Sequence, residues 1–399
     1  MWRLNRTWKR IKGAVEYAYL LAKHLLLTPV ARLLYGKKHV WIICERGTDA
    51  RDNGYHFFRY VREKHPKQQA YYIIDRQSAD YPKVAALGNV VQRGSIKHWL
   101  LFLGAEMRIS THINGYMPGK HWRYRAFASR KKGKSRTVFL QHGVTKDDMK
   151  GLHRENTHLN LFICGAEPEY EYILSTYGYS ERELKYTGFA RFDRLHHFGV
   201  RRQVLIMPTW RDWLSPDFHG DGLSAQAIQE SRYFQAWSAL LRSERLRTLA
   251  EQYQVSFIFY PHYEMQRFLD LFPQGNDAVV IADFAHYDVQ NLLKESMLLI
   301  TDYSSVFFDF AYMNKPTLYY QFDEDEYRAH HYARGYFDYR RDGFGEVVTE
   351  ETALLGLLER YLADGCRMQP EYQHRIEGFF PLHDEKNCER IYREVTALR

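Results

Sequence analysis

Short apolar runs alternate with helical patterns along most of this chain, and this alternation restricts the folds that it can adopt. Strands separated by helices form parallel sheets that are covered by helices on both faces. Twelve runs are predicted as strands, which exceeds one sheet of ordinary size. They are His39–Cys44, Ala70–Ile74, Asn89–Gln92, Met107–Thr111, Thr137–Gln141, Leu159–Cys164, Gln203–Met207, Val255–Tyr260, Ala278–Ile281, Met297–Thr301, Thr317–Tyr320 and Glu346–Val348. We therefore predict an α/β protein with two doubly wound, Rossmann-like domains.

Each half of the chain supplies six of these strands, so the join between the domains is predicted near Phe198–Arg202. We expect a basic arm over residues 1–38, an N-terminal domain over residues 39–200 and a C-terminal domain over residues 201–399, whose last helix can cross back. Ligands of open α/β sheets bind beyond the carboxyl ends of the strands. The active site is accordingly predicted in the cleft between the two domains.

The net charge of +8 originates in the first 38 residues, which hold nine Lys or Arg residues and one Glu. The balanced remainder disfavours a general polyanion binder, so no nucleic-acid partner is expected. Charges interrupt the apolar run from Ala14 to Leu34, which disfavours a membrane-spanning helix. Because the arm is also rich in Trp and Leu, we predict an amphipathic helix on an anionic membrane surface. A helix packed on the body with a solvated basic face is the alternative.

A second basic run covers residues 120–136, which include aromatic side chains and no acid. It suits a lipid headgroup or a lipid-linked pyrophosphate, and nucleic acid is the alternative. The four cysteines lie far apart without metal-ligand spacing, so they are predicted to be reduced thiols in the cytoplasm and no metal site is expected. No GxGxxG or Walker motif is present, which disfavours NAD enzymes and P-loop ATPases. We expect a peripheral protein on the cytoplasmic face of the cell membrane.

Polar clusters follow five of the predicted strands at the point where each strand ends. They are Glu45–Gly54, His142-Gly143, Pro208–Asp212, Pro261–Tyr263 and the turn Asp302–Ser305. The last is the most informative, because Ser304 and Ser305 are predicted to line the first turn of a helix. The free amides and the positive dipole end of such a turn suit a phosphate. A simple helix cap is the alternative.

Several residues of these clusters suit phosphate chemistry. A neutral imidazole at His142 can take a proton from an attacking hydroxyl, and Gly143 allows close approach to the backbone. His262 can contact a diphosphate or protonate a leaving phosphate. Arg211 offers a planar cation to a phosphate oxygen, with a surface salt bridge to Asp212 as the alternative. The acidic run Asp323-Glu324-Asp325 is interpreted as solvated charge, and Arg334 is a second candidate phosphate contact.

In this order the segments resemble the CDP-glycerol glycerophosphotransferase family, which makes teichoic acids and related capsules. The resemblance covers about His39 to Val348. Its motifs here are Ile300–Asp309 with Asp288 upstream and Arg334-Gly335 downstream, Gln141–Gly143, Pro208–Asp212 and Thr187–Asp193. One departure concerns His262, which follows Tyr260-Pro261, whereas the family's second histidine often follows a pair that contains Arg.

The resemblance implies a glycosyltransferase-B type enzyme. It would transfer glycerol phosphate, or ribitol phosphate, from CDP-glycerol or CDP-ribitol to a hydroxyl of a lipid-linked saccharide or polymer, and release CMP. No cofactor is implied, and magnesium on the donor diphosphate stays an open alternative. Other functions left open are a glycosyltransferase of the same fold that uses a sugar nucleotide, and a membrane- or nucleic-acid-binding module without catalysis.

The resemblance also implies roles for the site residues. His142 would be the general base, and His262 would be the second catalytic residue. The donor and its phosphates would be bound by Arg211, Asp288, Thr301, Asp302, Ser304, Ser305 and Arg334. The acceptor would be bound by Asp49, Arg51, Asp52, Asn53 and Gly143.

Overall fold

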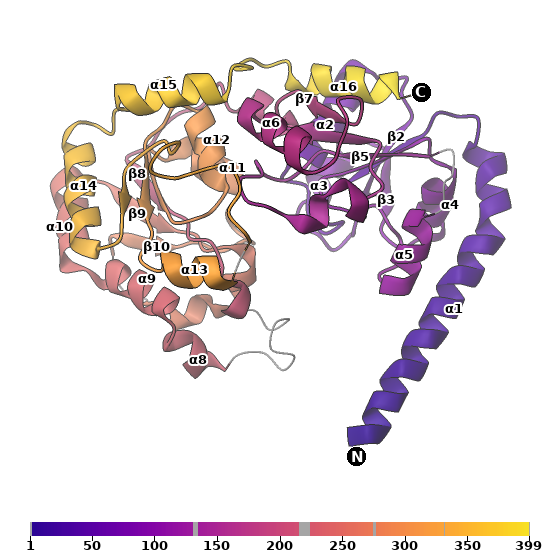
Figure 1. Cartoon of the computed structure of the whole chain (residues 1–399), viewed down its shortest axis with the longest axis horizontal. Helices are drawn as coiled ribbons and strands as arrows, with labels where there is room; N and C mark the ends of the chain where they lie inside the picture. The colour runs from indigo at the N-terminus through magenta and orange to yellow at the C-terminus, as the bar shows by residue number, and fades with distance from the viewer. Residues whose placement is uncertain (1, 131–134, 215–223, 274–276, 331, 399) are drawn as a thin grey trace. The chain divides into compact units, whose positions relative to one another are not determined.

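The computed structural model describes residues 2–130, 135–214, 224–273, 277–330 and 332–398 (Figure 1). Contacts within the chain divide it into two compact units. Unit 1 comprises Met1–His142, Lys150–Asp193 and Asp384–Arg399, and unit 2 comprises Gly143–Met149 and Arg194–His383. The main join thus follows Asp193, a few residues before the predicted one. The first 38 residues belong to unit 1.

Unit 1 is built on a seven-stranded parallel sheet in the order β3-β2-β1-β4-β5-β6-β7 within the described residues. Its strands are β1 (Trp41–Cys44), β2 (Ala70–Ile74), β3 (Val90–Gln92), β4 (Met107–Ser110), β5 (Arg136–Phe139), β6 (Leu161–Cys164) and β7 (Leu184–Tyr186). All four residues of β1 are buried, as a central strand covered on both faces requires. The edge strand β7 was not predicted, because Leu-Lys-Tyr forms no apolar run.

The helices of unit 1 are α1 (Trp2–Tyr35), α2 (Asn53–Lys64), α3 (Tyr81–Ala85), α4 (Ile96–Gly104), α5 (Trp122–Arg130), α6 (Glu167–Thr176) and α16 (Asn387–Ala397), with the 3-10 helices η1 (Lys150–Leu152), η2 (Arg154–Asn156) and η3 (Ala190–Arg194). Helix α1 packs beside α4 and α5 (Figure 1), burying Leu20, His24 and Ala31. Gly104 allows the close crossing, because a Cβ there would lie 2.7 Å from the Ala31 carbonyl oxygen. Within the described residues, α1 and every other helix fall short of the length or apolarity that crossing a bilayer requires.

Unit 2 repeats the same strand order in a six-stranded parallel sheet, β10-β9-β8-β11-β12-β13, within the described residues. Its strands are β8 (Gln203–Ile206), β9 (Ser256–Phe259), β10 (Val279–Ile281), β11 (Leu298–Thr301), β12 (Thr317–Tyr320) and β13 (Val347–Val348). Its helices are η4 (Asp212–Leu214), α8 (Ala225–Gln229), α9 (Arg232–Arg242), α10 (Glu244–Tyr253), η5 (Tyr263–Leu271), α11 (Val289–Glu295), α12 (Val306–Tyr312), α13 (Glu324–His330), α14 (Glu351–Ala363) and α15 (Pro370–Phe379).

The strand order reverses between β1 and β4 in unit 1, and between β8 and β11 in unit 2. At such a switch point the loops beyond the carboxyl ends diverge and leave room for a ligand. The loops after these four strands contain half of the predicted site residues, and His142 and His262 follow the neighbouring strands β5 and β9.

Candidate active site

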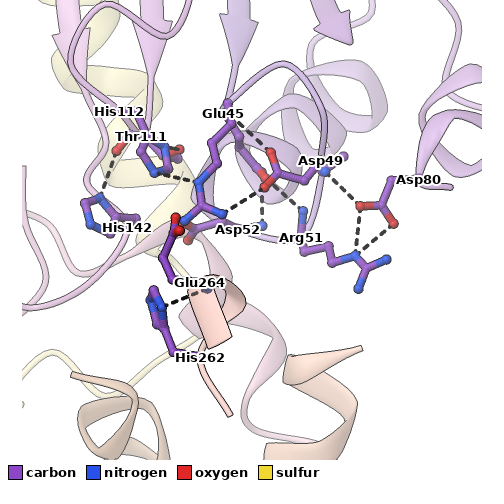
Figure 2. A network of polar contacts seen from close by, with 12 residues as sticks. Glu45, Asp49, Arg51, Asp52, Asp80, Thr111, His112, His142, His262 and Glu264 are labelled. Atoms are coloured by element: carbon purple, nitrogen blue, oxygen red, sulfur yellow. Dashed lines mark hydrogen bonds and ion pairs between the residues drawn. The ribbon is translucent and has the colours of Figure 1, made fainter. Parts of the chain in front are cut away.

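The loop after β1 is shaped by a buried carboxylate, Glu45 (Figure 2). Its two oxygens accept hydrogen bonds from the backbone amides of Arg51 at 2.9 Å, Asp52 at 3.0 Å and Tyr55 at 2.8 Å. Burial, together with the nearby carboxylates Asp49 and Asp52, raises the pKa of Glu45. Glu45 therefore fixes the backbone that presents the polar side chains of this loop, although sequence analysis assigned it no separate role.

The predicted acceptor-binding residues of this loop are tied to one another and to neighbouring elements. Arg51 donates to Asp80 at 2.8 Å, and Asp49 accepts from the backbone amide of Arg46 at 3.2 Å. Asp52 caps α2 and accepts from Arg191 at 2.8 Å. All three predicted residues keep partial exposure, so their contact with an acceptor stays a prediction.

Asn53 does not fit its predicted role in acceptor binding, because it is completely buried. Its side-chain nitrogen donates to the carbonyl oxygen of Gln141 at 2.9 Å, and its side-chain oxygen accepts from the backbone amide of Arg191 at 3.1 Å. An amide side chain can satisfy both a carbonyl and an N–H group in this way. Asn53 thus joins the loop after β1 to the loop that carries His142.

Gln141 positions His142 through a strained turn. Its φ of 56° lies in the left-handed region, which costs a non-glycine residue about 1–2 kcal/mol. The Gln141 side chain compensates by donating to Ile163 O at 2.9 Å and to the buried Glu169 carboxylate at 3.0 Å. The turn leaves His142 exposed directly beyond β5.

His142 and His112 form a stacked pair whose tautomers follow from their partners (Figure 2). The rings lie 4.6 Å apart at 8°. His142 Nδ1 lies 3.2 Å from the carbonyl oxygen of Thr111, which can only accept, so Nδ1 carries the proton and Nε2 carries the lone pair. His112 Nε2 accepts from Arg46 Nε at 3.2 Å, so His112 Nδ1 donates to Thr111 Oγ1 at 2.9 Å.

Both histidines are held in the neutral form. Although His142 keeps solvent exposure, desolvation by the protein packed around its ring lowers its pKa to about 4, and the cations Arg46 and Arg191 act in the same direction. Burial, His142 and Arg46 lower the pKa of His112 to about 2. At neutral pH, Nε2 of His142 is therefore ready to accept a proton, as a general base requires.

The pH dependence of activity follows from this lowered pKa. If His142 is the base, kcat/KM should stay flat from pH 8 down to pH 5 and fall only towards a midpoint near pH 4. An ordinary histidine would give a midpoint at about pH 6.5. The measurement is the rate of CMP release at limiting donor concentration, with folding monitored at each pH by circular dichroism. A midpoint near 6.5 would contradict the assignment.

In unit 2, Arg211 is completely buried among carboxylates and aromatic rings. It pairs with Asp302 at 2.9 Å and binds both oxygens of Asp323 at 2.8 and 3.0 Å. Its guanidinium also faces three tyrosine rings. The distances to the ring centroids of Tyr233, Tyr303 and Tyr327 are 4.9, 5.2 and 5.2 Å. Burial alone would lower the pKa of Arg211, but Asp302 and Asp323 raise it, so the cation is retained.

Three predicted phosphate contacts are thereby corrected. Arg211, Thr301 and Asp302 are buried, so none of them presents a side chain to a ligand. Thr301 Oγ1 donates to Met207 O at 2.7 Å, and Asp302 accepts from the amides of Thr209 and Tyr303 at 2.7 and 2.6 Å. They tie the end of β8 to the end of β11. Asp323, interpreted from sequence as solvated, is the buried partner of Arg211 instead.

The serine turn keeps its predicted place beyond β11, before the short helix α12. Ser304 and Ser305 are partly exposed. The Ser304 hydroxyl accepts from the Val306 amide at 3.4 Å, while Ser305 makes no capping hydrogen bond with its side chain. Ser305 packs against Gly143, where a Cβ would lie 2.7 Å from Ser305 Oγ. Gly143 is thus needed for this packing, whatever its contact with an acceptor.

Replacing Gly143 tests the importance of that packing. Gly143→Ala should displace the Ser305 hydroxyl, because a Cβ there would lie 2.7 Å from Ser305 Oγ, while the short side chain can rotate to another rotamer at little cost in stability. We expect donor affinity to fall about fivefold or more, measured by calorimetric titration with CDP-glycerol. Gly151→Ala is the matched control, since no atom lies within 4 Å of a Cβ at that position. Unchanged donor affinity in Gly143→Ala would show that the Ser305 hydroxyl does not contact the donor.

The remaining predicted residues of unit 2 differ in exposure. His262 is partly buried, stacks on Trp210 at 5.7 Å, and its Nδ1 accepts from the Glu264 amide at 3.3 Å. Nδ1 therefore carries the lone pair, and Nε2 of the neutral ring carries the proton. Asp288 caps α11, accepting from the Asn291 amide at 3.1 Å. Arg334 is exposed and lies 3.5 Å from Glu324 and 3.6 Å from Asp338.

A further cationic cluster was missed in the sequence. Lys146 and Asp147 are buried and paired, and Asp147 also accepts from Arg328 at 2.8 Å. Gly335 contacts the same segment, because a Cβ there would lie 2.4 Å from Lys146 O. The signal that could have revealed the segment is its position, directly after His142-Gly143. His112 was missed in the same way, although it follows the end of β4.

Comparison of the sequence with known protein families identifies the family of this chain. The family model for CDP-Glycerol:Poly(glycerophosphate) glycerophosphotransferase matches residues 26–397. The chain belongs to this family. Within it, the minor teichoic acid biosynthesis protein GgaB of Bacillus subtilis (strain 168) is 32% identical over 397 residues, covering 98% of this chain and 43% of GgaB. The teichoic acid glycerol-phosphate transferase of Staphylococcus aureus (strain NCTC 8325 / PS 47) is 26% identical and covers 88% of this chain and 89% of its own length.

Solved structures of relatives confirm the two-domain α/β fold. The wall teichoic acid polymerase TagF superposes with a TM-score of 0.67 at 17% identity, covering 98% of each chain. The chain spans less than half the length of two relatives, 43% of GgaB and 46% of the teichoic acid poly(glycerol phosphate) polymerase of Bacillus subtilis (strain 168).

Proposed function

We propose that this glycerophosphotransferase family member transfers glycerol phosphate from CDP-glycerol to a hydroxyl of a lipid-linked acceptor, in the synthesis of a teichoic acid or related polymer. The family match over residues 26–397 carries the proposal. It is supported by the Staphylococcus aureus relative, a glycerol-phosphate transferase that this chain covers over 89% of its length. Ribitol phosphate is the alternative cargo, because a teichoic acid ribitol-phosphate polymerase is also related, at 22% identity.

The reaction is a substitution at the β-phosphorus of the donor. The acceptor oxygen forms a bond to this phosphorus, the bond to the bridging oxygen breaks, and CMP leaves with the electron pair. His142 Nε2 takes the proton of the acceptor hydroxyl, which its lone pair and lowered pKa permit. Such a transfer depends mainly on positioning and on charge neutralisation.

His262 has the opposite tautomer to His142, which suits it to donate a hydrogen bond to the donor phosphates or to the leaving group. Because Nδ1 of His262 accepts from Glu264, its Nε2–H can donate to a phosphate oxygen or to departing CMP. Ser304, Ser305 and Arg334 keep exposure that donor contact requires. These groups provide charge and hydrogen bonds for the diphosphate, and magnesium would supplement them if it accompanies the donor.

The decisive experiment identifies donor, acceptor and number of additions together. The protein is incubated with CDP-glycerol, CDP-ribitol or UDP-sugars and with lipid-linked saccharides, and products are weighed by mass spectrometry. We expect CMP release and a mass increase of one or more glycerol phosphate units. Incorporation of sugar from a UDP-sugar, without turnover of CDP-alditols, would overturn the proposal.

We also propose that α1 attaches the protein to an anionic membrane surface. Large apolar side chains are exposed along one side of α1 at spacings of three, four and seven residues, namely Trp8, Ile11, Val15, Tyr19, Leu26, Val30 and Leu33. Leu33 is 87% exposed and Leu26 is 74% exposed. This stripe lies apart from the buried Leu20, His24 and Ala31, so α1 has two apolar faces. On α5, Trp122 is exposed as well.

Charged substitutions on the exposed stripe should release the protein from membranes. We expect Leu26→Glu with Leu33→Glu to weaken binding to phosphatidylglycerol vesicles by tenfold or more in sedimentation assays, because each loses apolar contact and adds repulsion. The matched control is Ile96→Glu with Val200→Glu, which changes two exposed apolar residues outside α1. Equal release by both pairs would point to net charge, and no release by the first pair would refute the attachment.

A further inference from the structure

A cavity of about 840 Å³ lies in unit 1 at the amino ends of the central strands. Glu106 and Arg136, at the starts of β4 and β5, line it together with the C-terminal half of α1. His142 follows the carboxyl end of β5, at the opposite edge of the same sheet. The cavity is therefore separate from the candidate active site, and none of the reaction steps uses it.

The cavity is strongly cationic. Four lining side chains are cationic, namely Arg32, Lys37, Arg108 and Arg136, against the single carboxylate of Glu106. Glu106 is engaged with His39 at 2.9 Å. Within the described part of the chain, none of the four cations forms an ion pair with a carboxylate. An excess of unpaired cations around one cavity indicates an anionic ligand.

Arg108 is the central group, because it is partly buried without a counterion. Its Nε donates to Phe102 O at 3.0 Å, and its guanidinium lies 4.2 Å from the centre of the Phe102 ring. These contacts fix the side chain but neutralise no charge. Burial lowers the pKa of Arg108, which reflects the cost of this uncompensated cation. A phosphate could receive the guanidinium in a two-pronged hydrogen bond and remove that cost.

The remaining walls indicate that the ligand is amphiphilic. Leu103, Ala105 and Ala128 line the cavity beside the cations. Its α1 wall belongs to the helix whose other side carries the exposed apolar stripe. A small free anion would leave the apolar walls without contact, whereas the glycerol and first acyl carbons of a lipid would cover them.

We propose that this cavity binds the phosphate headgroup of an anionic glycerophospholipid. The proposal rests on the membrane attachment of α1 only for the source of the lipid. Arg108 would hold the phosphate, Arg32 and Arg136 would complete its charge balance, and Leu103 and Ala128 would contact the glycerol end of the acyl chains.

The test uses the full chain and soluble dihexanoyl phosphatidylglycerol below its micelle concentration, titrated calorimetrically. Arg108→Gln should weaken binding tenfold or more, and Arg136→Gln, an exposed residue, should weaken it severalfold. Arg123→Gln is the matched control, because Arg123 is exposed on α5 but does not line the cavity. Inorganic phosphate is titrated in parallel and should bind far more weakly.

Each outcome decides the proposal. Unchanged lipid affinity in both Arg108→Gln and Arg136→Gln would overturn it, and inorganic phosphate that binds as tightly as the lipid would replace the lipid by a free anion. If Arg108→Gln does not fold, a photoactivatable phosphatidylglycerol on the wild-type chain decides, since it should label residues 103–108 and refute the site if it labels only the exposed stripe. If the protein binds the soluble lipid but not vesicles, the proposed lipid site in the cavity is supported and only the proposed membrane attachment of α1 is refuted.

Discussion

Replacing His142 by Ala should abolish transfer and leave donor binding nearly intact. A general base contributes about 10²–10⁴ in rate, so CMP release should fall by at least about a hundredfold. His142→Asn is a second variant, because its amide can still donate to Thr111 O without offering a base. Transfer rates are measured by CMP release, and donor affinity by calorimetric titration with CDP-glycerol.

The control for this change is His158→Ala, which removes an exposed histidine of unit 1. Its transfer rate should match that of the wild type. If His142→Ala loses donor affinity in proportion to rate, His142 belongs to the donor pocket instead. If it retains the rate, proton transfer from the acceptor occurs elsewhere.

Replacing Arg211 should strongly lower the stability of unit 2, because Arg211 is a buried structural cation and not an exposed contact for substrate. Arg211→Gln leaves Asp302 and Asp323 buried without their cation, and breaking a buried ion pair costs about 3–5 kcal/mol. We expect a loss of this size in the free energy of unfolding, measured in urea. Hydrogen exchange should locate the loss at the ends of β8 and β11.

Arg334→Gln is the comparison for Arg211, since Arg334 is an arginine of unit 2 with an exposed side chain. Its stability should change by less than about 0.5 kcal/mol, while donor affinity should fall. A stable Arg211→Gln protein with weakened donor binding would restore the direct phosphate contact expected from sequence.

The fold was accessible from sequence because its signals are local. Buried parallel strands such as Trp41–Cys44 are continuous apolar runs, and polar residues directly after them mark the strand ends. The same reasoning placed His142 and the serine turn directly beyond strand ends, where the structure has them. It missed β7, whose three residues include Lys185 and form no apolar run.

The pairing of charged residues was not accessible, because it depends on which distant segments meet. Arg211 and Asp323 are separated by 112 positions, and Asp323 belongs to an acidic run that is typical of solvated loops. Asn53 likewise has its partners at Gln141 and Arg191. Polar residues at a strand end therefore predict where a site lies, but their roles as ligand or support are decided by tertiary packing.

The two apolar faces of α1 restrict how the proposed membrane attachment can be removed without damage to the fold. One face of the helix completes the core of unit 1 through Leu20 and Ala31, while the other is exposed. A shortened chain that begins after residue 38 would uncover Trp99 and Phe102, which pack in the same cluster as Leu20. Truncation would therefore expose core side chains and favour aggregation, whether or not α1 binds a membrane. A variant that no longer binds membranes therefore has to be made by substitutions on the exposed stripe of α1, with the buried face left unchanged.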